Sequence, residues 1–345
     1  MPEIAGTPWR APGAPWALVV AAGLAATVGT ALGIAVATVP PLPLLSGLLV
    51  GTAALAILRS PNLGVVLFVV MATLLPFAVV PIRIVFAPTF VDIILTALLS
   101  SWAIRILRRD QGLRLSLPHL FLAIFLGLTT VSLLMGTALA ALTPEQLRLF
   151  LKLVNSLLLF FSVVQVVRAE ADLIAVNRAL IIAAVAAAAI ALGLYVLPRE
   201  QALELLLTLE PIGYPTGPDV LRPIAGADAL RAIGTAVDPN VLGALLMIAG
   251  TLIAAQLTAR RSVLTRWLLL GGAAAILPAI ALTFSRSSWV GLVAGLAFLA
   301  TFRDRRLWLL APAAALALTV APQGKPSLRA WQPASSCATR RRSCG

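Results

Sequence analysis

Charged residues, cysteine and histidine are scarce in this sequence of 345 residues, and each scarcity excludes a class of protein. Only 11% of the residues are charged, whereas soluble globular domains carry about 25%. The two cysteines, Cys337 and Cys344, both lie close to the C-terminus, which excludes a disulfide framework in the main part of the chain. The single histidine, His119, leaves no His/Cys set with the spacing of a metal site. We therefore expect neither a metal nor a cofactor.

Hydrophobic residues make up 60% of the sequence, and its mean hydropathy is +1.01. Apolar runs of about 20 residues recur along the chain, and each is long enough to cross a bilayer as a helix. These runs predict an all-α polytopic membrane protein. The formal net charge of +13 then indicates basic residues that flank membrane helices and meet anionic lipid head groups, rather than a surface for nucleic acid.

About eleven membrane helices are predicted by the apolar runs and by the prolines that fall between them. They cover residues 16–39, 42–58, 63–81, 91–107, 118–139, 147–167, 173–197, 239–257, 264–283, 287–302 and 307–320. The chain then divides into a cytoplasmic tail (1–15), seven helices (16–197), one long outer loop (198–238), four helices (239–320) and a polar, basic tail (321–345). Pro76 and Pro278 fall inside predicted helices, where membrane proteins tolerate proline as a kink.

The distribution of Lys and Arg predicts the orientation, because cytoplasmic loops carry an excess of these residues. With the N-terminus in the cytoplasm, the basic clusters at 105–114 and 259–266 both lie inside. We therefore predict a multi-pass protein of the inner (cytoplasmic) membrane. The cations that oppose this bias, at or near the outer face, are Arg83, Arg148, Lys152, Arg199, Arg222, Arg231 and Arg286.

A polar stripe is predicted on the sixth helix. Arg148, Lys152 and Asn155 follow one another at spacings of four and three residues, which place them on one helix face. Two explanations stay open for the cations: their long side chains reach up to the outer head groups, or they bind a ligand. Asp92, at the start of the predicted fourth helix, is better explained by stabilisation of the helix N-terminus than by catalysis.

Two arginines that oppose the charge bias, Arg231 and Arg286, lie in distinctive motifs. Arg231 opens RAIGTAVDPNVLGALL, in which Asp238 and Pro239 are residue types favoured at a helix start. Arg286 lies in LTFSRSSWVGL among hydroxyl residues, and Ser285, Ser287 and Ser288 are candidate caps of the following helix. Neither arginine is needed for capping, and a guanidinium at a membrane boundary must face water, a cavity or an anion. We predict that both bind an anionic, lipid-borne substrate.

In their order and spacing, these two motifs resemble the core of the O-antigen ligase and O-antigen polymerase family. The family's usual form is an arginine and glycine before a Pro-Asn helix start, then a Thr/Ser-Arg-Gly/Ser boundary, and the resemblance covers roughly residues 16–320. Members are polytopic glycosyltransferases of the inner membrane. They transfer a glycan from an undecaprenyl-pyrophosphate carrier to an acceptor at the outer face, without metal or nucleotide sugar. The resemblance implies the lipid-linked glycan, its acceptor and membrane lipids as partners, and no nucleic acid.

The resemblance also implies roles for single residues. Arg231 and Arg286 match the family's pyrophosphate-binding arginines. The further candidates are Lys152 and Arg222 for the pyrophosphate, and Asn240, Asn155 and Ser285 for the glycan or the acceptor. Guanidinium groups suit this site because they bind phosphate through two parallel hydrogen bonds and stabilise the charge that develops on a leaving group.

The chain departs from the family after Val320. Members have a larger outer loop beyond the second motif, often with a catalytic histidine, whereas residues 321–345 are polar and basic and contain none. A truncated or frame-shifted end would have this composition, and the sequence then offers no identifiable catalytic base. Two alternatives stay open. One is a transporter or flippase for polysaccharide or its lipid carrier, which would carry acidic or broken-helix sites near the membrane midplane. The other is an inactive member of the family.

Overall fold

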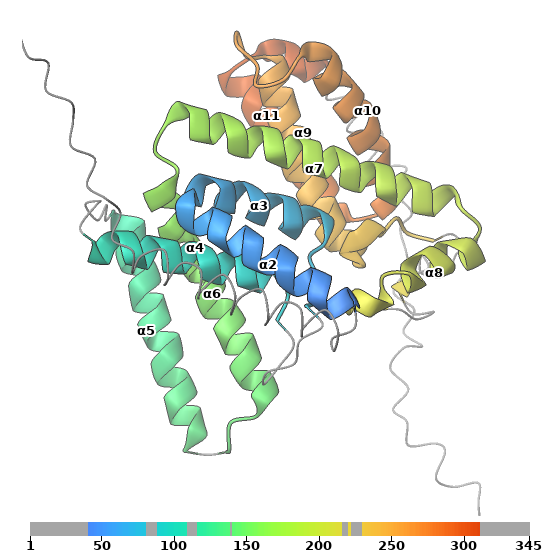
Figure 1. Cartoon of the computed structure of the whole chain (residues 1–345). Helices are drawn as coiled ribbons and strands as arrows, with labels where there is room; N and C mark the ends of the chain where they lie inside the picture. Colours follow the sequence, from blue (N-terminus) through green and yellow to red (C-terminus); the bar gives the residue numbers. More distant parts are fainter. Residues whose placement is uncertain are drawn as a thin grey trace, which may run out of the picture. The chain divides into compact units, whose positions relative to one another are not determined.

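The structure, a computed structural model, describes residues 41–80, 88–108, 116–138, 140–215, 220–221 and 230–310 (Figure 1). The chain divides into two units, residues 1–52 and 53–345. Regular elements in the described ranges are all helical, and the pairing between Val79 and Thr89 is an isolated antiparallel bridge. The all-α prediction is confirmed for this part of the chain. The predicted helix 16–39, Arg222 and the tail 321–345 lie outside the described residues.

The helices overlap the predicted segments of the described ranges (Figure 1). The longer ones are α2 (Pro41–Arg59), α3 (Pro61–Leu74), α4 (Phe90–Leu107), α5 (Leu117–Thr137), α6 (Pro144–Val166), α7 (Glu170–Val196), α9 (Pro239–Leu257), α10 (Arg266–Thr283) and α11 (Arg286–Phe302). The shorter ones are α8 (Arg199–Leu207) and the 3-10 turns η1 (Glu210–Ile212), η3 (Gly234–Ala236) and η4 (Arg305–Leu310). In its described residues, the predicted long loop 198–238 thus contains one short helix and two 3-10 turns.

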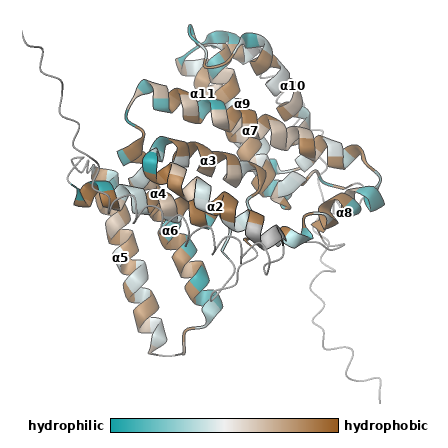
Figure 2. Cartoon of the chain, in the orientation of Figure 1, coloured by the Kyte–Doolittle hydropathy of each residue, from teal (hydrophilic) through white to brown (hydrophobic). Residues whose placement is uncertain are grey.

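Six of the described helices are long and apolar enough to cross a membrane: α4, α5, α6, α7, α9 and α10. α3, α11 and the part of α2 from Leu45 to Arg59 are shorter apolar helices. Figure 2 shows hydrophobic residues along the helices and hydrophilic residues mainly near their ends. These features support a polytopic membrane protein. They do not support the predicted count of eleven, and the predicted helix 307–320 begins as the 3-10 turn η4 before the described residues end.

Pro76 explains why α3 is shorter than predicted. The predicted span 63–81 passed through this proline as a kink, but α3 ends at Leu74, and Leu75 has left the helical conformation with φ −138° and ψ 57°. Proline blocks the turn before it and disfavours helical geometry in the preceding residue. The chain after Pro76 pairs instead with the segment before α4: Val80 donates its backbone N–H to the carbonyl of Pro88 at 3.0 Å.

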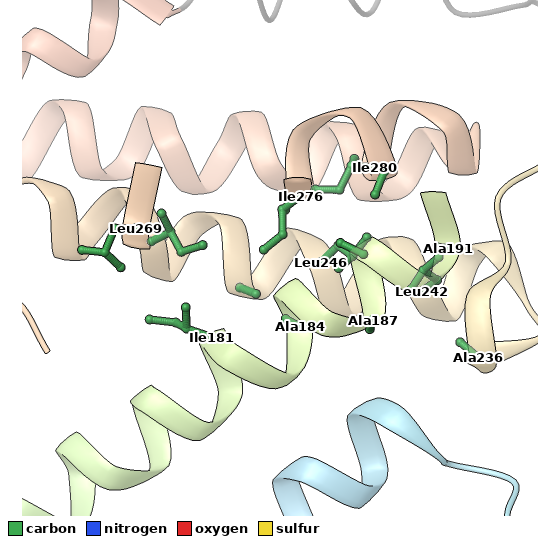
Figure 3. Close-up of a cluster of buried hydrophobic side chains, with 14 residues drawn as sticks. Ile181, Ala184, Ala187, Ala191, Ala236, Leu242, Leu246, Leu269, Ile276 and Ile280 are labelled. Carbon is green, nitrogen blue, oxygen red and sulfur yellow. The ribbon is translucent and has the colours of Figure 1, made fainter. Parts of the chain in front are cut away.

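The largest hydrophobic core joins α7, α9 and α10 (Figure 3). Its buried residues are Ile181, Ala184, Ala187, Ala188 and Ala191 of α7, Leu242, Leu246, Ala249 and Ile253 of α9, Leu269, Ile276, Ala279 and Ile280 of α10, and Ala236 of η3. The alanines of α7 recur on one side of the helix, so α9 and α10 approach it closely. Close approach matters in a membrane, where helix association depends on packing rather than on the hydrophobic effect.

α11 packs on α9 through glycines. Gly291 and Gly295 stand one turn apart on α11 and face Met247 and Thr251 of α9. A Cβ atom added at Gly295 would lie 2.8 Å from Oγ1 of Thr251, and one added at Gly291 would meet Sδ of Met247. A small residue repeated every fourth position is the usual means of bringing two membrane helices into contact. α9 therefore fixes the position of α11.

Candidate functional site

Arg231 connects two segments that lie far apart in the sequence. Its Nε donates to the carbonyl of Thr283 at 2.8 Å, and its Nη2 donates to Oδ1 of Asn240 at 3.0 Å. The backbone N–H of Ala232 donates to the carbonyl of Leu282 at 2.8 Å. Thr283 is the last residue of α10, and Asn240 lies in the first turn of α9. The first predicted motif is thus hydrogen-bonded to the second.

A tight turn carries Arg286 to the same end of these helices. α10 ends at Thr283, Phe284 adopts a left-handed conformation with φ 48°, and α11 begins at Arg286. Ser285 and Ser288 are buried, whereas Arg286 is exposed. Because Arg231 binds the residue three positions before Arg286, both predicted arginines belong to one junction between α9, α10 and α11.

The prediction that Ser285 caps α11 is wrong. Its side chain makes no capping hydrogen bond to the helix. Its Oγ instead accepts a hydrogen bond from Oγ of Ser288 at 2.9 Å and lies 3.2 Å from Oγ of Ser287. The reason is burial: Ser285 and Ser288 are both buried, and their hydroxyl groups satisfy each other, whereas Ser287 is exposed.

α9, in contrast, begins as predicted. Oδ1 of Asp238 accepts hydrogen bonds from the backbone N–H groups of Asn240 at 2.7 Å and Val241 at 3.4 Å, so Asp238 is the N-cap. Pro239 occupies the first helical position. The N-termini of α9 and α11 thus belong to the same junction, and helix N-termini favour anions. The junction therefore brings together the positive ends of two helix dipoles and two guanidinium groups.

The backbone is strained at two residues of this junction. In the described part of the chain, Val237 and Phe284 are the non-glycine residues with positive φ, at 59° and 48°. Each immediately precedes the N-cap of a helix in the junction, α9 or α11. A β-branched residue in this conformation is an outlier, and such strain costs on the order of 1–3 kcal/mol at each position. Strain of this kind concentrates at ligand-binding and catalytic sites.

Gly243 allows α9 to pack closely against Ser285 and Ser288, and adding a methyl group at this position tests that packing. A Cβ atom at this position would lie 2.5 Å from Oγ of Ser288 and 3.2 Å from Cβ of Ser285. We expect Gly243→Ala to lower the free energy of unfolding by about 1–3 kcal/mol, the usual cost of overpacking. Gly271→Ala is the matched control, because nothing lies within 4 Å of the added atom. Equal thermal stability of the two purified variants in detergent would contradict this packing.

The predicted stripe on α6 lines a different space. Arg148, Lys152 and Asn155 all line a cavity of about 570 Å³ between α6 and α4. The α4 side is polar as well, with Asp92, Thr96 and Ser100 in the lining. The sequence analysis missed these two hydroxyl residues. Their four-residue spacing from Asp92 was the available signal, because it places all three on one helix face. Lys152 and Asn155 are thus grouped with α4 rather than with the arginine junction.

Two charges at this cavity have local partners. Asp92 forms a capping box with Thr89: the backbone N–H of Asp92 donates to Oγ1 of Thr89 at 3.1 Å, and Oδ2 of Asp92 accepts from the backbone N–H of Thr89 at 3.1 Å. The helix-stabilising role predicted for Asp92 is confirmed. Arg148 pairs with the exposed Glu145 at 3.7 Å. Lys152 is therefore the cation of this cavity lining without an ion pair in the described residues.

His119 and Tyr214 do not suit the role of catalytic base. His119 is buried at the start of α5, where its Nδ1 accepts a hydrogen bond from the backbone N–H of Ser116 at 3.1 Å, and its ring packs against Phe161. Burial raises the pKa of Tyr214 to about 12, so this phenol stays protonated at neutral pH. Within the described ranges, no three His, Cys, Asp or Glu side chains gather to hold a metal ion.

These features define the class: an all-helical membrane protein with a strained, arginine-bearing helix junction and a polar cavity between α4 and α6. No protein-family profile, curated protein or solved structure matches the chain. The resemblance to the O-antigen ligase and polymerase family therefore stays a prediction.

Proposed function

We propose that this protein transfers a glycan from an undecaprenyl-pyrophosphate carrier to an acceptor hydroxyl at the outer face of the inner membrane. The supporting observation is the hydrogen bond from Arg231 to the carbonyl of Thr283, which joins the two motifs of the family resemblance. Arg286 follows within the same turn. A junction with two arginines and two helix N-termini suits a pyrophosphate group.

The reaction is a displacement at the anomeric carbon of the glycan. The acceptor oxygen forms a bond to this carbon, the bond from the carbon to the pyrophosphate oxygen breaks, and the electron pair stays on the pyrophosphate. Negative charge therefore grows on the leaving group, where fixed guanidiniums lower the barrier. Thr283 and Asn240 hold the guanidinium of Arg231 in place before the substrate arrives. The hydroxyl proton passes to a base that we do not assign to a described residue.

The cavity between α4 and α6 supports a second part of the same proposal. Its volume of about 570 Å³ falls in the usual range for small-molecule sites. Lys152 and Asn155 would contact the glycan or its carrier there. Both side chains carry hydrogen-bond donors, and both line the cavity from α6. Lys152 would add a point charge rather than the two parallel hydrogen bonds of an arginine.

The direct test is reconstitution. Purified protein in liposomes should convert an undecaprenyl-pyrophosphate-linked oligosaccharide and an acceptor into glycosylated acceptor and free undecaprenyl pyrophosphate. A flippase, the alternative, would move the carrier across the bilayer without releasing the glycan. That alternative has less support, because α10 continues through Pro278 from Arg266 to Thr283 instead of breaking. Translocation without glycan release would contradict our proposal.

The proposed orientation predicts opposite labelling of two loops. Three membrane helices, α6, α7 and α9, separate Ala141 from Ser262, so the two positions lie on opposite sides. With the N-terminus in the cytoplasm, a membrane-impermeant thiol reagent should label Ala141→Cys in intact cells and Ser262→Cys only after permeabilisation. Both variants are made in a background that lacks Cys337 and Cys344. The reverse pattern would invert the orientation, and labelling of both in intact cells would contradict the helix assignment.

A further inference from the structure

A small basic pocket lies at the end of the helices opposite the arginine junction. Its volume is about 250 Å³, and its lining includes Arg59, Asn62, Trp102 and Arg105. Arg59 ends α2, Arg105 lies in the last turn of α4, and Asn62 lies in the first turn of α3. Val166, the last residue of α6, also lines the pocket. Four helix ends therefore converge on the pocket.

Arg59 and Arg105 are held close together. Nη2 of Arg105 donates a hydrogen bond to the backbone carbonyl of Arg59 at 3.3 Å. This contact draws the second guanidinium to the end of the helix that carries the first. Both residues line the pocket, so an anion bound there would offset their like charges. An arginine pair is also the arrangement that proteins use for phosphate.

Trp102 contributes a donor that the protein itself leaves unused. Its Nε1 is buried and has no hydrogen-bond partner in the described part of the chain. An unsatisfied buried donor costs free energy, so most such groups find a partner. Indole is a donor only, and its partner must therefore be an acceptor. Trp102 also lines the pocket, so an anion bound there is the acceptor that a small shift of the indole would bring within reach of this donor.

The start of α3 adds to the positive potential. Ser60 is the N-cap of this 14-residue helix, yet its side chain makes no capping hydrogen bond. Asp172 lies beside this lining: it accepts from Nδ2 of Asn62 at 2.5 Å and from the backbone N–H groups of Arg168 at 3.1 Å and Ala169 at 2.9 Å. Asp172 thus fixes the start of α7, and its hydrogen bonds go to groups of the protein.

We propose that this pocket binds a phosphate group, either the head group of an anionic lipid or a free phosphate ion. Both ligands present the same chemistry, a compact anion with several acceptor oxygens. It would meet two guanidinium groups, the indole N–H of Trp102 and the N-terminus of α3. The pocket is smaller than the roughly 300 Å³ at which sites for larger organic ligands begin. In the proposed orientation it faces the cytoplasmic head groups, where anionic lipids attract basic residues. The proposal does not depend on glycan transfer.

Binding is measured on the purified full-length chain by thermal unfolding in detergent. One series adds inorganic phosphate, and a second adds phosphatidylglycerol or phosphatidylcholine in mixed micelles. We expect saturable stabilisation by phosphatidylglycerol or by phosphate, and none by phosphatidylcholine. The double variant Arg59→Gln/Arg105→Gln should bind at least tenfold more weakly. The control Arg260→Gln/Arg261→Gln removes the same charge from the loop between α9 and α10 and should bind as the wild type does.

Trp102→Phe separates ligand binding from folding. It removes the unsatisfied Nε1 donor but keeps an aromatic ring, so the ligand-free protein should be no less stable than the wild type. Its affinity should fall about tenfold or more, as expected for a lost hydrogen bond to a charged group. Lipid-specific stabilisation would identify a head-group site, and phosphate-specific stabilisation a site for the soluble ion. Wild-type affinity in both Trp102→Phe and the arginine double variant, or no saturable binding by the wild type, would overturn the proposal.

Discussion

Arg231→Ala is expected to abolish glycan transfer and to weaken binding of undecaprenyl pyrophosphate by at least tenfold. The reason is that Arg231 has two functions in the junction. Its guanidinium supplies positive charge, and its hydrogen bonds to Thr283 and Asn240 fix the ends of α10 and α9 relative to each other. Alanine removes both, and it leaves a carbonyl and an amide oxygen without this donor. The free energy of unfolding should also fall, by about 1–3 kcal/mol.

The control for Arg231 must remove a comparable hydrogen bond without touching the junction. Arg178 offers one, because its Nε donates to the backbone carbonyl of Val263 at 2.6 Å, beyond the other end of α9 and α10. Arg178→Ala should lose stability similarly but keep transfer. Arg231→Lys should restore part of the binding, since lysine supplies charge without the two-donor geometry of arginine. If Arg231→Ala and Arg178→Ala have the same activity in reconstituted liposomes, Arg231 does not act on the substrate.

Local signals explain which parts of the fold could be predicted. Asp238 and Pro239 predict the start of α9 because the N-cap side chain and the rigid proline act within one helical turn. The helix ends were harder to predict. Pro76 and Pro278 are the same residue in similar apolar surroundings, yet α3 stops before the first and α10 continues through the second. Around Pro278, buried α10 residues such as Ile276 pack into the α7–α9–α10 core, and this support is invisible in a linear sequence.

The candidate site shows the same contrast: its unusual residues could be found from the sequence, but their contacts in the folded protein could not. Charge bias along the chain was enough to select Arg231, Arg286 and Lys152 as unusual cations. It did not reveal that Arg231 bonds to a carbonyl 52 residues away. It also did not separate Lys152 from the arginines, because spacing within α6 says nothing about which helix lies opposite. Such pairings depend on side-chain volume and helix packing, which are properties of the folded bundle.

Arg286→Ala should abolish transfer with little effect on folding, which distinguishes it from Arg231→Ala. Arg286 is exposed at the first position of α11, and a cation at a helix N-terminus is electrostatically unfavourable for the helix. Exposed substitutions of this kind usually change the free energy of unfolding by no more than about 0.5 kcal/mol. In the proposed function, the guanidinium of Arg286 acts on the pyrophosphate of the carrier, so its loss affects transfer rather than folding. Pyrophosphate binding should weaken by at least tenfold.

Arg266→Ala is the matched control for this variant. Arg266 is also an exposed arginine at the first position of a helix, but it begins α10 at the end opposite the junction. The two substitutions therefore remove the same charge from the same kind of helix position, and they differ in the end of α10 at which they lie. Transfer and pyrophosphate affinity should be lost in Arg286→Ala and retained in Arg266→Ala, at equal thermal stability. Full transfer by Arg286→Ala would show that Arg286 does not act on the pyrophosphate and would contradict a site with two arginines at this junction.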